Sequence, residues 1–218
     1  MRVEAAQVFL REDAQISTAT LGMGSGGTVE VNTRQLRYET GGQVSALTLG
    51  ESPGGTVIVN AAESIELSGV GAESFPSGLF SQTQGAGNAG DLRVSTPRLR
   101  LREGAKISVS GESLGNAGFL EIDADRLRLE TGATLTGETV SGQGGDIRIR
   151  SNDMRLRGEV RFQRRRERRN FRGMGGILPS TRRRWWGWKI AILRRTRLRG
   201  LGENCDRHSR HFWSRGTR

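Results

Sequence analysis

The chain has 218 residues, with 34 Lys and Arg against 23 Asp and Glu, 32 glycines and a single cysteine. One cysteine excludes a disulfide framework and any zinc site built from cysteines. No apolar run approaches the roughly 18 residues that a transmembrane helix needs. The first residues contain no hydrophobic signal-peptide segment, so we expect no export signal in this chain.

The net charge of +11 is unevenly distributed along the chain. Residues 1–159 hold 15 Lys and Arg against 20 Asp and Glu, a net charge of −5. Residues 160–218 hold 19 against 3, a net charge of +16, together with all four tryptophans, both histidines and the cysteine. The sequence therefore predicts two regions, a patterned region at 1–158 and an Arg/Trp-rich tail at 159–218 that we expect to be disordered.

The patterned region is an internal repeat. Pairs of small residues recur at intervals of 28, 35, 28 and 27 residues, at positions 26–27, 54–55, 89–90, 117–118 and 144–145. The longer interval contains an extra loop around residues 73–78. After each pair come three short segments in which apolar and polar residues alternate, the pattern of half-buried strands. In the fourth unit these segments are residues 92–94, 99–101 and 107–109.

Three strands joined by sharp corners form one triangular rung. Turn formers such as Thr40-Gly41-Gly42, Glu103-Gly104 and Thr131-Gly132 supply the positive φ angles that such corners require. Since a single rung cannot bury enough apolar surface to fold alone, rungs must stack and pair equivalent strands. We therefore predict an all-β fold, a parallel β-helix of about five to six rungs of 27–28 residues, truncated at both ends.

The alternation also predicts which side chains face inward. In the fourth unit the inward set is Leu92, Val94, Leu99, Leu101, Ile107 and Val109, and the outward set includes Arg93, Arg98, Arg100, Arg102, Lys106 and Ser108. Residues 1–17 align without a gap onto residues 92–108, which places Met1 at an inward strand position. We therefore expect this chain to be an internal piece of a longer repeat protein.

Several strings in the repeat resemble a known family. They are GSGGTV at 24–29, AAESIELSG at 61–69, FPSGLF at 75–80, GAGNAGDL at 85–92 and GAKIS at 104–108. Together they resemble the repeats of large bacterial filamentous-haemagglutinin-like exoproteins, over about residues 1–158. The resemblance implies a right-handed parallel β-helix, export by two-partner secretion and a role in adhesion or surface architecture. The secretion domain and signal peptide of that family are not found in this sequence, which puts autonomous export in doubt.

Under this resemblance the chain is expected to be a non-enzymatic structural or adhesive fragment of a secreted or surface protein. Its expected partners are glycans or proteins on host or neighbouring cells. For the intact parent protein, an outer-membrane two-partner secretion transporter is a further expected partner.

The basic tail leaves several alternatives open. Arginine runs at 164–166, 168–169, 182–184 and 194–195 surround three tryptophans at 185–188, a mixture that could bind nucleic acid or adsorb to an anionic membrane surface. Neither alternative is supported by an ordered motif, and the tail contains no RNP, zinc-finger or helix-turn-helix pattern. A third interpretation is that the DNA for residues 160–218 encodes further rungs but is translated in the wrong reading frame. The same codons, read in a shifted frame, can encode repeat-like segments. Resequencing that finds no such frame would contradict it. A fourth is that the chain is the non-functional product of a decayed gene.

Candidate chemical sites are weak throughout. Cys205, Asp206, His208 and His211 lie close together, but their spacing matches no closed zinc site and arginines surround them. Asp123 and Asp125, expected in a turn, could be imagined as paired acids for glycoside chemistry, but solvated carboxylates are favoured. The corner at 141–146 resembles a calcium-binding repeat without its period. We therefore predict no catalytic, metal-binding or cofactor-binding residue.

Overall fold

The computed structural model describes residues 1–113, 115–140, 144–163, 190–193 and 197–199. All secondary-structure elements in these ranges are β-strands, so the all-β prediction is confirmed. No helix in this part of the chain has the length and apolar character needed to cross a membrane.

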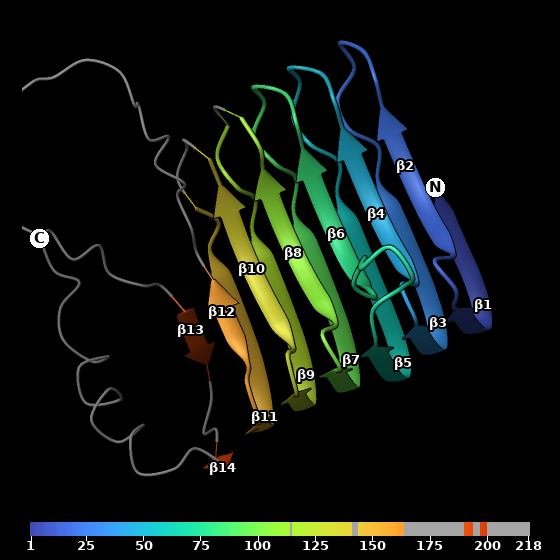
Figure 1. Ribbon diagram of the computed structural model, residues 1–218, viewed down its shortest axis with the longest axis vertical. Coiled ribbons are helices and arrows are strands. Elements are labelled where there is room, and N and C mark those ends of the chain that lie inside the picture. Colours follow the sequence, from blue (N-terminus) through green and yellow to red (C-terminus); the bar gives the residue numbers. More distant parts are fainter. Residues whose placement is uncertain (114, 141–143, 164–189, 194–196, 200–218) are drawn as a thin grey trace, which may run out of the picture.

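Six rungs stack along one axis, and each consists of one long strand followed by one short strand (Figure 1). The long strands are β1 (Arg2–Leu10), β3 (Val29–Glu39), β5 (Val57–Ser68), β7 (Leu92–Arg102), β9 (Leu120–Glu130) and β11 (Ile147–Arg157). The short strands are β2 (Gln15–Thr20), β4 (Gln43–Thr48), β6 (Gly78–Thr83), β8 (Lys106–Gly111), β10 (Thr134–Thr139) and β12 (Arg161–Gln163). Long strands form one sheet and short strands the other, each in rung order.

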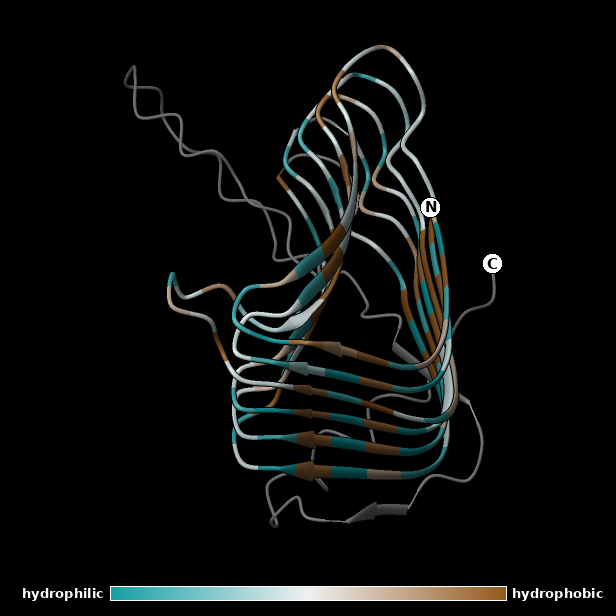
Figure 2. Cartoon of the chain, turned by 90° about the vertical axis from the view of Figure 1, so that its right-hand side faces the viewer, coloured by the Kyte–Doolittle hydropathy of each residue, from teal (hydrophilic) through white to brown (hydrophobic). Residues whose placement is uncertain are grey.

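Successive rungs pair in parallel, residue against equivalent residue. Leu92 pairs with Leu120, 28 positions later, and Leu120 with Ile147, 27 positions later. Val57 pairs with Leu92 across the longer interval of 35. The register therefore reproduces the predicted repeat, and the chain winds as a right-handed parallel β-solenoid (Figures 1 and 2).

The paired region extends beyond residue 158. β12 pairs with β10, so that Phe162 lies beside Leu135 and continues the short-strand sheet. Two short strands of the predicted tail, β13 (Ile190–Leu193) and β14 (Arg197–Arg199), pair with β11. The rest of the tail from residue 164 onward lies outside the described residues, so the predicted disorder and frame shift remain predictions.

Each long strand contains two of the predicted segments, joined at a bend. Separate short strands were expected at 92–94 and 99–101, but both belong to β7. The bend residue Pro97 takes no part in the pairing register, which suits a residue that has no amide hydrogen to donate. Across the bend, the amide of Arg98 donates to Oγ1 of Thr96 at 3.4 Å. This local hydrogen bond lets the chain change direction without ending the strand.

The predicted inward set forms a continuous core. All six apolar residues predicted to face inward in the fourth unit are no more than 2% exposed. Ser108, however, was predicted to face solvent and is only 1% exposed. It lies between Phe80 and Thr136 in the short-strand sheet, both of them buried. Its Oγ accepts a hydrogen bond from Oγ1 of Thr136 at 2.7 Å, so neighbouring outward side chains cover it.

The predicted corners adopt the expected backbone. Thr40 and Gly41 have φ angles of 45° and 89°, and Glu103 and Gly104 have φ angles of 55° and 82°. The corner after β1 differs because both of its positive-φ positions, Glu12 and Asp13, carry side chains. Between β5 and β6, the extra residues form a loop that projects from the rungs (Figure 2) and is anchored by a bridge between Val70 and Pro76.

A column of glycines brings the rungs together at the loops that follow the short strands. Its members are Gly27, Gly55, Gly90, Gly118 and Gly145. A Cβ atom built on any of the last four would overlap the carbonyl oxygen of the preceding glycine in the column. The glycines are therefore required by the close approach of one backbone to the next.

Replacing Gly90 by Ala is expected to destabilise the fold by about 2–3 kcal/mol, because the new methyl group must displace the backbone of the rung before it. Gly22→Ala is the matched control, since a Cβ there meets no atom within 4 Å. Urea unfolding of both variants measures the difference. Equal stabilities would contradict the steric role of the column.

Tyr38 is the only tyrosine of the chain and is fully buried in the second rung. Its hydroxyl has no hydrogen-bond partner among the residues that the structure describes. Burial raises the pKa of this phenol above its ordinary value, because the phenolate would lose its hydration. The hydroxyl therefore contributes no pairing energy to the core.

Tyr38→Phe is expected to leave stability unchanged or raise it by up to about 1 kcal/mol, since it removes an unpaired buried polar group. Since the folded-state pKa of Tyr38 is raised, the unfolded chain releases the proton first, and the wild type loses stability as pH rises above about 10. The variant lacks this contribution to alkaline unfolding. Ultraviolet titration of the single tyrosine should show ionisation together with unfolding, and ionisation near pH 10 in the folded state would contradict the assignment.

Candidate functional site

The predicted acidic pair does not form a catalytic arrangement. Asp123 and Asp125 lie within β9 rather than in a turn, because the buried Ala124 between them keeps its inward place in the strand. A carboxylate oxygen of Asp123 lies 3.8 Å from an Arg150 guanidinium nitrogen. Oδ1 of Asp125 accepts a hydrogen bond of 2.9 Å from Asn152, so each carboxylate has its own partner on β11.

The remaining predicted sites fall mainly on residues that the structure does not describe. Cys205, Asp206, His208, His211 and the basic runs with their tryptophans lie outside the described residues. In the corner at 141–146, residues 141–143 also lie outside the described residues. The backbone carbonyl of Asp146 accepts a hydrogen bond from the backbone amide of Leu120. Within the described ranges, no group of three or more His, Cys, Asp or Glu side chains could hold a metal ion.

A dense cluster of arginines covers one outer face of the solenoid. We define the arginine face as the outward positions that follow the bend in β7, β9 and β11. These positions are Arg98, Arg100, Arg102, Arg126, Arg128, Glu130, Asp153, Arg155 and Arg157. They alternate with buried residues such as Leu99, Leu127 and Met154. Seven arginines stand against two acids, so the face carries a net charge of +5.

The strand register sets these arginines side by side. Arg98 pairs with Arg126, and Arg100 pairs with Arg128, which pairs in turn with Arg155. Neighbouring strands lie about 4.8 Å apart, and outward residues along one strand are about 6.6 Å apart. The face is therefore a regular array of seven guanidinium groups and two carboxylates fixed to a sheet, with Asp153 beside Arg126 and Glu130 beside Arg157.

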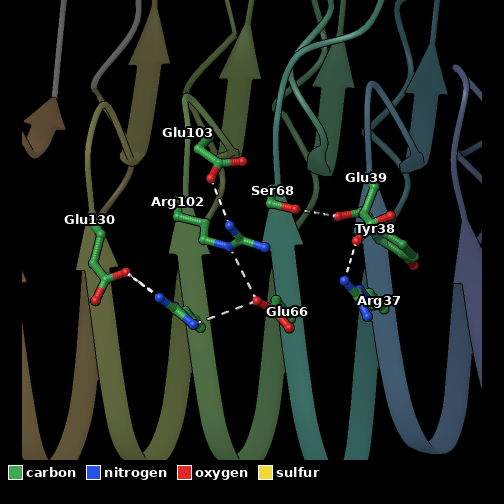
Figure 3. A network of polar contacts seen from close by, with 9 residues as sticks. Arg37, Tyr38, Glu39, Glu66, Ser68, Arg102, Glu103 and Glu130 are labelled. Carbon is green, nitrogen blue, oxygen red and sulfur yellow. Dashed lines mark hydrogen bonds and ion pairs between the residues drawn. The ribbon is translucent and has the colours of Figure 1, made fainter.

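Three of the arginines make ion pairs or carboxylate hydrogen bonds, and Figure 3 shows the network around Arg102, Glu66 and Glu130. Arg100 donates from Nε and Nη2 to one oxygen of Glu130, at 3.1 and 2.7 Å. This hydrogen bonding is the main reason why the pKa of Arg100 lies above its ordinary value. Arg102 donates to Glu66 at 3.2 Å and to Glu103 at 2.6 Å.

The third is Arg155, whose Nε lies 3.1 Å from a carboxylate oxygen of Asp153. Arg98 instead donates to the backbone carbonyl of Glu63 at 3.2 Å. The remaining three arginines, Arg126, Arg128 and Arg157, are exposed and form no ion pair with any described residue.

The fold itself does not require this concentration of arginine. At the corresponding positions of the second rung stand Gln35, Arg37 and Glu39, and Arg37 pairs with Glu39. In the third rung the corresponding residues include Ser64 and Glu66. Like charges directly opposite on paired strands destabilise a sheet, so the later rungs carry an electrostatic cost that the earlier rungs avoid.

Comparison with known proteins gives no further assignment. No family model matches the chain, and neither a curated protein nor a solved structure matches it. The candidate site therefore depends on the geometry and charge of the described residues alone.

Sequence reasoning placed four arginines of the fourth unit on the outward side, and three of them belong to the arginine face. It did not combine them with Arg126, Arg128, Arg155 and Arg157. The signal was present, because Arg100, Arg128 and Arg155 follow one another at the repeat intervals of 28 and 27 residues. Aligning polar positions in the same way as apolar positions would have found the face.

Arg128→Gln is expected to stabilise the protein at low salt by about 0.2–0.5 kcal/mol, because it removes a charge placed between Arg100 and Arg155. The gain should disappear in high salt, which screens exposed charges. Arg37→Gln is the control, since it removes an arginine that lies next to Glu66 and pairs with Glu39. Denaturant unfolding at two salt concentrations distinguishes them, and destabilisation by Arg128→Gln at low salt would contradict the repulsion.

Proposed function

We propose that this chain is a non-enzymatic, structural and adhesive segment of a secreted or cell-surface protein, and that its outer surface contacts another cell. The observation that carries the proposal is the regular stack of six rungs, whose apolar residues are directed inward and whose outward residues form an extended lattice. Solenoids of this kind present long binding surfaces without needing a pocket.

The sequence resemblance to filamentous-haemagglutinin-like exoproteins supports the same proposal, since adhesion and surface architecture are what that resemblance implies. Under it, the expected partners are surface glycans or proteins of host or neighbouring cells. Export of the intact parent through a two-partner secretion transporter belongs to the proposal as well.

Adhesion can be tested with beads that carry the full chain and are washed over a layer of epithelial or bacterial cells under flow. The control beads carry a Gly90→Val/Gly118→Val variant, in which two glycines of the column gain side chains. Loss of its β-structure is confirmed by circular dichroism. Because the variant keeps the whole basic tail, it separates adhesion by the folded solenoid from adsorption through the tail.

We expect several-fold more retention of beads that carry the folded chain. Equal retention of both kinds of bead would overturn the proposal and assign the adhesion to the tail. Retention no better than that of uncoated beads would overturn it as well.

A further inference from the structure

We propose that the arginine face binds a linear acidic polysaccharide through the carboxylate groups of its uronic acid units. This inference rests on the proposed adhesive function and names the chemical class of the ligand. Its ligand-binding groups are Arg126, Arg128 and Arg157, which lack ion pairs within the described chain, with Arg98 beside them.

The first argument is uncompensated charge. Arg128 has an arginine on each side, in β7 and in β11. Arg126 stands between Arg98 and Asp153, and Arg157 stands beside Glu130, but neither forms an ion pair with a described residue. The arginine–arginine pairs oppose folding, and earlier rungs of the same solenoid show that the fold forms without them. A bound polyanion would turn this repulsion into attraction, which gives the cluster a physical reason to exist.

The second argument is the chemistry that the face already displays. Two N–H groups of Arg100 converge on one carboxylate oxygen of Glu130, and Arg102 contacts the carboxylates of both Glu66 and Glu103. Guanidinium groups match carboxylates in both shape and charge. Carboxylates therefore suit the arginines of this surface, and a ligand that supplies more of them would satisfy the unpaired ones.

The third argument is geometry, which favours a polymer over a small anion. Arg126 and Arg128 lie on one strand, about 6.6 Å apart, and Arg157 belongs to the neighbouring strand β11. These groups project from an open sheet rather than converge on one point, so one small anion cannot contact them all. A chain with repeated carboxylates gains from several weak contacts made at once.

Nucleic acid fits this face less well. Unpaired bases are bound by stacking on aromatic side chains, and the arginine face contains none. Base edges in a duplex are read by a helix or ribbon that enters a groove, whereas this surface is one face of a continuous sheet. Phosphate contacts alone would remain, and these are included as an outcome of the test.

The test measures binding of the full chain to immobilised polygalacturonate and to the same polymer with its carboxylates methyl-esterified. The face variant is Arg126→Gln/Arg128→Gln/Arg157→Gln, which breaks no ion pair between described residues. The control variant is Arg11→Gln/Arg34→Gln/Lys106→Gln, which removes the same amount of charge elsewhere. Both variants keep the basic tail, so its contribution to binding is equal in the two, and circular dichroism checks that both are folded.

The face variant should weaken binding to polygalacturonate about tenfold, as expected from the loss of charged hydrogen bonds. The control variant should weaken it by less than about twofold. The esterified polymer should bind far more weakly than the acid form, and added salt should reduce the difference between the variants. Glu130→Gln, which removes the carboxylate that Arg100 binds at 2.7 Å and leaves only the longer contact with Glu66, should tighten binding about threefold.

Equal losses in the two triple variants would overturn the inference, because binding would then follow net charge or the tail. Equal binding of the acid and esterified polymers would also overturn it. So would tighter binding of DNA than of polygalacturonate through the same arginines. If the polygalacturonate test fails while the bead assay still shows adhesion by the folded chain, the proposed ligand class is wrong and the proposed adhesive function is retained.

Discussion

The parallel hydrogen-bond ladder between equivalent residues of successive rungs is the constraint on which the rest of the structure depends. Because every rung must match the next, an apolar residue must stand at each inward position, and a glycine where the backbones approach most closely. The column through Gly55, Gly90 and Gly118 shows how tight this match is. Where the chain departs from the period, one added residue shifts the register within β5 and the others leave the ladder as the loop between β5 and β6.

The same constraint leaves the outer surface free to vary. Side chains that point away from the core need only be compatible with their neighbours across the ladder, and rungs that share one backbone differ widely there. The later rungs use this freedom to collect seven arginines on one face, at some cost in repulsion. A rigid sheet that repeats one charged group at fixed spacing suits a ligand that also repeats, which connects the scaffold to the proposed adhesive role.

The periodicity of the sequence was sufficient to predict the register, the inward residues and the positive-φ corners, since all three follow from stacking identical backbones. It could not predict that two strands would join through a bend at Pro97, because both arrangements show the same alternation. Nor could it predict the burial of Ser108, which depends on side chains that neighbouring rungs place beside it. The ion pairs of the arginine face likewise depend on residues about 30 positions apart, such as Arg100 and Glu130.

The central claim is that the rungs stabilise one another through the shared ladder, and amide hydrogen exchange on the full chain tests it most directly. Mutual stabilisation predicts slow exchange in the central strands β5 to β9, with the long and short strands of one rung exchanging together. Protection should decrease toward β1 and β2, whose apolar residues are only partly buried. Widely different rates for β7 and β8, or central rungs that exchange as fast as the first, would contradict the account.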